Sequence, residues 1–136
     1  MRNFKDKVID TLSTALSGTK VVSDEPQSPE ELPCVAVIMI RNSADMGSYD
    51  ERMSAPRYNV GMQVDMYTVG ADAPITVENL FEKVDASMQG MKFVLDDYAV
   101  TNNIDRTISR GVARYSAKVE PHYSTSEDTT YYIYRR

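Results

Sequence analysis

The sequence predicts an α+β fold, in which two helices pack on one face of a mostly antiparallel sheet of four to five strands. Apolar and polar side chains alternate strictly over residues 58–66, as expected for a strand with one packed face and one open face. An apolar stripe at helical spacing follows almost at once, at Val77, Leu80, Phe81, Val84, Met88 and Met91. The uncovered face of such a sheet must meet solvent or another subunit.

The first part of the chain predicts a helix and then a largely buried strand. A helix is expected over residues 2–17, with Gly18 just past its end, because apolar residues recur at Phe4, Val8, Leu12, Ala15 and Leu16. Residues 19–32 contain two prolines and several carboxylates, which is typical of a solvated connector. The apolar run from Pro33 to Ile40 then predicts a strand inside the sheet, with its second face partly covered.

A polar loop of unusual length, residues 42–56, is expected between these first two strands of the sheet. The alternating strand that follows it should end near Tyr67. We expect the second helix to begin with Asp72 as its N-cap and Pro74 in its first turn, and to end at Gly90.

The last part of the chain predicts two or three further strands. Residues 93–100 indicate a short strand, and residues 108–119 a longer one whose apolar face changes near Gly111. A glycine at a change of face is typical of a β-bulge. Residues 121–128 should form a turn before a last, aromatic strand at residues 131–136.

Bulk composition excludes several classes of protein. The 136 residues suit a single domain, 1–136. A formal net charge of −5 disfavours a protein that binds nucleic acid by neutralising phosphates. The apolar runs are far shorter than the roughly 20 residues that span a bilayer, and we expect no signal peptide and synthesis in a cytoplasm. Cys34 is the single cysteine, so it cannot form an internal disulfide and should be a small core residue.

No catalytic, metal or cofactor site is expected. His122 is the single histidine and should be an exposed residue of a polar turn. Asp96 and Asp97 are adjacent, so in a regular strand their carboxylates would point to opposite faces. The acidic residues near Asp45 lack the spacing of a calcium loop, and the glycines never cluster into a phosphate-binding loop.

Two segments carry interaction signals. The long loop places Met46, Tyr49, Arg52 and Met53 among polar residues, and it is either a contact arm or a flexible hairpin tip. The final strand carries tyrosines on both of its faces, at Tyr131, Tyr132 and Tyr134. One face of that strand should complete the core, and the other should meet water or a neighbouring subunit.

The order of these segments resembles a known family. The chain contains "LPCVAVIMI", then "QVDMYT" before a helix with "LFEKVDASM", then "RGVARYSAKV". This order is similar to that of the tail terminator proteins of long-tailed bacteriophages, also named tail completion or minor capsid proteins of the neck. The resemblance covers roughly residues 4–120, and residues 121–136 are an extension or a last strand.

The resemblance implies a structural virion protein, not an enzyme. Such subunits form a hexameric ring that caps the tail tube, stops its polymerisation and joins the tail to head-completion proteins. The ring would be assembled in the host cytoplasm and remain in the neck of the virion, with no membrane and no cofactor. DNA would pass through it without specific binding, and acidic residues should outnumber basic ones on the lumen wall.

Candidate contacts between subunits or rings follow from the exposed and polar positions. They are Met46, Tyr49, Arg52, Met53, Gln63, Asp65, Tyr67, Arg114, Lys118, Tyr132 and Tyr134. A head-completion or stopper protein of the adjacent neck layer is the first alternative function. A small ligand-binding domain or enzyme is the second, and it requires a concave apolar site with perturbed ionisable groups.

Overall fold

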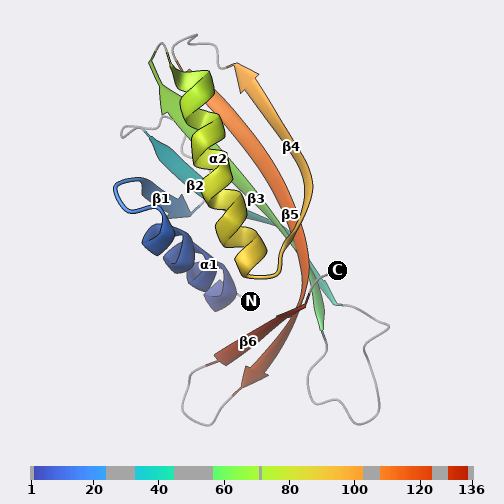
Figure 1. Cartoon of the computed structure of the whole chain (residues 1–136). Helices are drawn as coiled ribbons and strands as arrows, with labels where there is room; N and C mark the ends of the chain where they lie inside the picture. The colour runs from blue at the N-terminus through green and yellow to red at the C-terminus, as the bar shows by residue number, and fades with distance from the viewer. Residues whose placement is uncertain are drawn as a thin grey trace.

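The structure is a computed structural model, and it describes residues 2–23, 33–44, 57–70, 72–102, 108–123 and 129–134. Two helices cover one face of a mostly antiparallel sheet, which confirms the predicted α+β class (Figure 1). The sheet has six strands rather than four to five. The elements are α1 (Arg2–Ala15), β1 (Lys20–Ser23), β2 (Cys34–Ala44), β3 (Tyr58–Val69), α2 (Ala73–Gly90), β4 (Val94–Asn102), β5 (Ile108–Tyr123) and β6 (Thr129–Tyr134).

The additional strand is β1, which lies within the segment predicted to be a connector. It pairs in parallel with β2, with Val21 opposite Val35, whereas the other neighbouring strands are antiparallel. Four residues with two valines are too short for an alternation to be recognised in the sequence. β1 forms because α1 and the turn after it place residues 20–23 beside the edge of β2.

β5 is the longest strand, with 16 residues, and it organises one end of the sheet. One edge of β5 pairs with β3, and the other edge pairs first with β4 and then with β6. The sheet therefore runs in the order β1-β2-β3-β5-β4, and β6 continues it beyond the end of β4 (Figure 1). His122 pairs with Thr130 inside this β5–β6 ladder, so the predicted turn begins later than residue 121.

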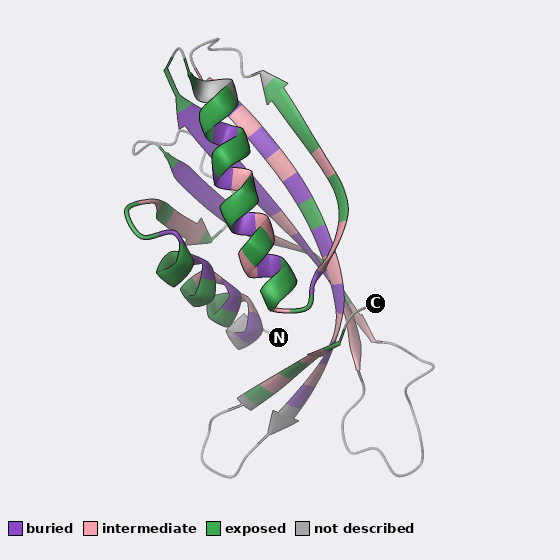
Figure 2. Cartoon of the chain, viewed as in Figure 1, coloured by how far each residue is buried: buried purple, intermediate pink, exposed green. Residues whose placement is uncertain are grey.

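The core lies between the two helices and the sheet. The apolar positions of the alternating strand all face the helices, and Val60, Met62, Val64 and Met66 are buried there as predicted. Figure 2 shows the same division on the helices, which bury one side against the sheet and expose the other. Cys34 is also buried. Of the helices that the structure describes, none is long and apolar enough to cross a membrane.

The helix ends differ in detail from the prediction. α1 stops at Ala15, and Gly18 follows with the positive φ of +90° that favours glycine. Asp72 is the N-cap of α2, but its backbone carbonyl accepts the bonds from Ile75 and Thr76, at 3.0 and 2.9 Å, and its side chain makes no cap bond.

α2 ends at Gly90 as predicted, but Lys92 is the residue whose left-handed conformation closes the helix. Lys92 has a φ of +72°, and its N–H donates to the carbonyl of Gln89 at 2.9 Å. The N–H of Phe93 donates to the carbonyl of Met88 at 3.0 Å. These two bonds form a Schellman motif, in which the residue after the C-cap must adopt a left-handed conformation. Burial of Phe93 and Met88 holds the turn in place.

The predicted β-bulge at Gly111 is wrong. β5 pairs with β3 in one unbroken register, and Gly111 lies opposite Met66 on the helix-covered face. A Cβ atom at residue 111 would lie 3.1 Å from Val77 on α2 and 3.3 Å from the Tyr98 hydroxyl. Gly111 is therefore required by the close approach of α2. The register shifts occur instead in β2, between Met39 and Arg41, and in β4, next to Asp97.

Replacing Gly111 with valine should lower the free energy of unfolding by about 2 kcal/mol, because the larger side chain cannot fit under α2 without moving it. Denaturant unfolding measures the change. Gly90→Ala is the matched control, since nothing lies within 4 Å of a Cβ at that position. The control should be at least as stable as the wild type, and equal stability of both variants would contradict this account.

Candidate functional site

The face of the sheet opposite the helices is the first candidate surface. Neither described helix covers it, and by strand register it carries the alternate residues Asn59, Gly61, Gln63, Asp65 and Tyr67 of β3. The neighbouring outward residues of β5 include Arg110, Arg114 and Lys118. Polar residues from different strands are thus brought side by side on one face.

Asp65 is the centre of a polar network on this face. The side chain is fully buried, although it lies on the face that the helices leave open. Its carboxylate accepts hydrogen bonds from Arg110 Nη2 at 2.5 Å, Gln63 Nε2 at 3.0 Å and the Tyr67 hydroxyl at 3.5 Å. The Arg110 guanidinium lies over the Tyr67 ring, 5.7 Å from its centre. A buried carboxylate is stable only when charged and polar partners surround it in this way.

The network continues across β5 to β4. Arg114 Nε donates to Gln63 Oε1 at 3.2 Å, and Arg114 Nη1 donates to Asp97 Oδ2 at 3.2 Å. The Ser116 hydroxyl donates to Asp96 Oδ1 at 3.0 Å. Both carboxylates of the Asp96–Asp97 pair therefore lie on the uncovered face. The expectation that they point apart is wrong, because the register shift in β4 falls at this point.

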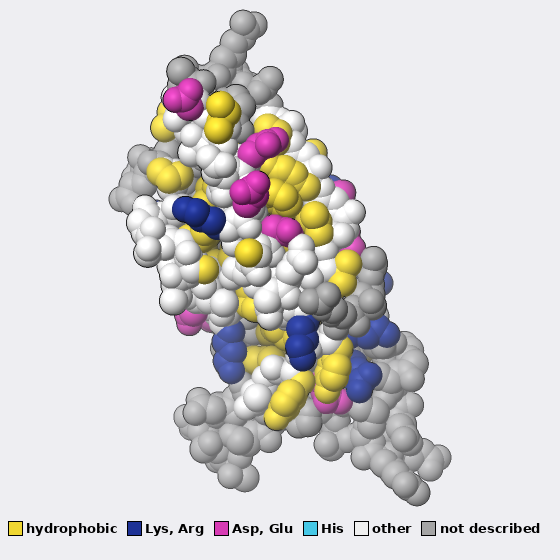
Figure 3. Space-filling model, viewed as in Figure 1, with side chains coloured by type: hydrophobic (Ala, Val, Ile, Leu, Met, Phe, Trp, Pro, Cys, Tyr) yellow, Lys and Arg dark blue, Asp and Glu magenta, His cyan; other side chains and the backbone are white. Residues whose placement is uncertain are grey.

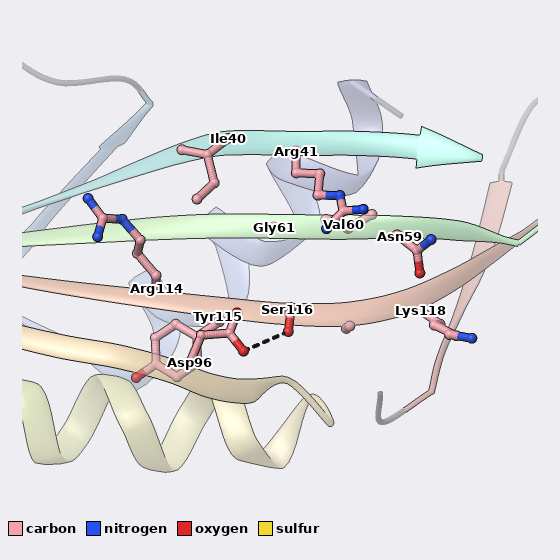
Figure 4. A pocket seen from close by; sticks show the side chains of 11 residues that line it. Ile40, Arg41, Asn59, Val60, Gly61, Asp96, Arg114, Tyr115, Ser116 and Lys118 are labelled. Carbon is pink, nitrogen blue, oxygen red and sulfur yellow. Dashed lines mark hydrogen bonds between the residues drawn. The ribbon is translucent and has the colours of Figure 1, made fainter. Parts of the chain in front are cut away.

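A depression of about 490 Å³ lies beside this network, over Gly61 (Figure 4). Gly61 leaves it open, since a Cβ there would lie 3.1 Å from Arg41 and 3.2 Å from Ile40. Its outward residues are charged and polar, with Ile40 the large apolar exception. They are Ile40, Arg41, Asn59, Asp96, Arg114, Ser116 and Lys118.

The two tyrosines with perturbed ionisation lie on the other face, under the helices. Burial raises the pKa of Tyr115 strongly, and its hydroxyl donates to Asp85 Oδ1 on α2 at 2.9 Å, which raises it further. Burial also raises the pKa of Tyr98, with a smaller effect from Glu78. The Tyr115–Asp85 bond ties α2 to β5 and lies apart from the outward-facing residues of the depression.

The aromatic strand β6 forms the second candidate surface. Tyr131 and Ile133 pack inward, with the Tyr131 ring 5.3 Å from that of Phe4. Tyr132 and Tyr134 face outward and are 48% and 36% exposed, so this strand divides between core and surface as its sequence predicts. The Tyr134 hydroxyl donates to Glu120 at 3.4 Å.

The structure brings together some of the predicted contact residues. Gln63, Asp65, Tyr67 and Arg114 share one network, and Lys118 lines the adjacent depression. Arg110 was not among the predicted residues, although it lies at the same spacing as Arg114 and Lys118 on the polar side of its strand, which is the signal that could have found it. The loop residues Met46, Tyr49, Arg52 and Met53 lie outside the described residues, as does the side chain of His122.

Within the described residues, no group of three or more His, Cys, Asp or Glu side chains is arranged to hold a metal ion. The two surfaces offer hydrogen-bonding groups, ion pairs and exposed aromatic rings.

Comparison with known proteins gives a match in fold. No family model matches the sequence, and no curated protein matches it. Among solved structures, the chain is similar to a chain in the virion of a native gene transfer agent (GTA) particle, with a TM-score of 0.60 and 13% sequence identity. The match covers 83% of this chain and 91% of that one. The chain shares its fold with a virion component.

Replacing Arg110 with methionine should lower the free energy of unfolding by about 3 kcal/mol, because it leaves the buried Asp65 carboxylate without its cation. Arg114→Met is the matched control on the same strand. Its ion pair with Asp97 is exposed and should contribute less than about 1 kcal/mol. Urea unfolding compares the two variants, and an equal loss in both would contradict a buried network centred on Asp65.

Proposed function

We propose that this chain is a structural subunit of a phage-like virion, which forms a ring at the neck of the tail. The ring caps the tail tube, stops its polymerisation and joins the tail to head-completion proteins. The observation that carries the proposal is the fold match to a virion chain along nearly the whole of both proteins. The resemblance of the sequence to tail terminator proteins supports the same role.

The uncovered sheet face supports an assembly role. Its side chains are already held by hydrogen bonds between strands, as in the Arg110–Asp65 and Arg114–Gln63 contacts. A surface that is ordered before binding loses little conformational entropy when it docks, so its contacts contribute more fully to affinity. Such a face suits a subunit that must meet neighbours in one defined orientation.

The charges of this face also suit a ring around DNA. Both of the central arginines are paired with carboxylates, at Arg110–Asp65 and Arg114–Asp97. By strand register and contact, the described part of the face carries six basic and four acidic side chains: Lys20, Arg41, Arg57, Arg110, Arg114 and Lys118 against Asp65, Asp96, Asp97 and Glu120. Arg57 pairs with Glu120 at 3.8 Å, so at least three of the six basic side chains are held by carboxylates. A cation that is already paired releases fewer counterions on meeting a phosphate, so DNA would be held weakly by this face.

Particles produced without this chain should show tail tubes of variable and excessive length, together with filled heads that carry no tail. Electron microscopy of the particles measures both, and supplying the wild-type chain should restore uniform, joined tails. Tails of normal length that fail to join heads would instead place the chain in the adjacent stopper layer. Normal particles in its absence would contradict a neck function altogether.

A further inference from the structure

A second depression, of about 280 Å³, lies where the end of α2 meets β6. We name it the β6 patch, and it is lined by Gly90, Met91, Lys92 and Tyr131–Tyr134. It includes the two exposed outward tyrosines of β6. Aromatic side chains that are half exposed beside a hollow are typical of protein contact surfaces.

Lys92 occupies this patch at a conformational cost. It is the non-glycine residue with a positive φ, +72°, in the described part of the chain. Glycine would relieve that cost at the end of a helix, yet the sequence has an exposed lysine there. A residue kept in an unfavourable conformation on a surface indicates a use for its side chain.

The surroundings of the patch carry more basic than acidic side chains. The Lys7 ammonium lies 5.0 Å from the centre of the Tyr131 ring, and the Arg57 guanidinium lies 4.5 Å from that of Tyr134. Glu120 offsets one of these charges, because it pairs with Arg57 at 3.8 Å. Figure 3 shows lysine and arginine side chains gathered around β6 at this end of the molecule. A complementary partner would carry carboxylates and some apolar surface.

The exposed side of α2 has that composition. Ile75, Glu78 and Glu82 are spaced by three and four residues, so they form one stripe on the helix, which we name the α2 patch. Ile75 is 65% exposed, the highest value among the large apolar residues of the described chain, and both glutamates are exposed. Figure 3 shows the acidic side chains gathered along α2, away from the basic end.

We propose that the β6 patch of one subunit binds the α2 patch of a second copy of this chain. Lys92 meets Glu78 and Glu82, and Ile75 packs on Tyr132 and Tyr134. The two patches are different surfaces of one molecule, so each copy uses both at once and the contact is head to tail. Repetition of such a contact closes a ring. The assignment rests on the proposed ring function, for which it names the contact between neighbouring subunits.

A disulfide experiment tests the contact directly. Residue 78 and Gly90, the last residue of α2, are about 18 Å apart from the helical rise per residue, and residue 92 lies beyond that end of the helix. This separation is far beyond the roughly 7 Å that a disulfide spans. A Glu78→Cys/Lys92→Cys variant can therefore form its bond only between molecules. Oxidised at about 1 mM protein, it should give covalent trimers and larger chains on a non-reducing gel. Each single variant can give dimers at most, because Cys34 is buried.

Lys83→Cys/Lys92→Cys is the matched control. Lys83 is exposed on the same helix but is turned by about 140° from Glu78, outside the α2 patch. It should give no chains beyond dimers. Chains of equal length from both double variants, or none from the first, would overturn the proposed contact.

Charge reversal supplies an independent measurement. Lys92→Glu and Glu78→Lys should each weaken self-association at least tenfold in sedimentation velocity, because like charges then face each other. An equimolar mixture of the two variants should recover it to within about threefold. Lys92→Gly should raise the midpoint of thermal unfolding and still weaken association, which a purely structural lysine would not do. Unchanged association in all these variants would overturn the contact.

The outcome is separable from that of the proposed function. Normal tail termination with no covalent chains would remove this interface and leave the neck role in place. Covalent chains from the Glu78→Cys/Lys92→Cys variant, together with normal particles in the absence of the protein, would support the contact between subunits and contradict the neck role.

Discussion

The pairing of β3 with β5 is the constraint on which the rest of the structure depends. The two strands pair over the full 12 residues of β3, from Tyr58 opposite Val119 to Val69 opposite Ile108. Because side chains alternate along a strand, this one register puts the apolar residues under the helices and Asp65 beside Arg110 on the other face. A slip of one residue would exchange the two faces and bury the charges.

The two faces of the sheet consequently have different roles. The covered face supplies stability through a continuous apolar core, and the Tyr115–Asp85 bond fixes α2 above β5. The uncovered face holds the buried Arg110–Asp65 ion pair, which adds little net stability. The free energy lost when the two charges leave water roughly cancels their attraction. Such a pair specifies side-chain geometry more than it adds stability. A rigid, polar sheet face is a useful property in the assembling subunit that we propose.

α2 contributes both to the buried core and to the α2 and β6 patches on the surface. Its buried stripe anchors it over Gly111, while its outward side carries Glu78 and Glu82. Its final turn requires a left-handed residue, and Lys92 takes that position beside the tyrosines of β6. The two glutamates and Lys92 thus lie on separate surfaces of one molecule, and opposite charges placed in this way favour the head-to-tail contact that we propose.

The sequence by itself determined the fold class, both helices and the strands β2 to β6, because their apolar periods are local properties of the chain. It also determined that one face of β6 would complete the core and the other would stay outside it, but only the structure shows that Tyr132 and Tyr134 are the exposed pair. Tertiary structure decided the rest. β1 exists only because β2 offers it an edge, Gly111 is needed only because α2 crosses it, and Arg110 meets Asp65 only in one register. Each of these depends on residues far apart in the chain, whose separation no local pattern encodes.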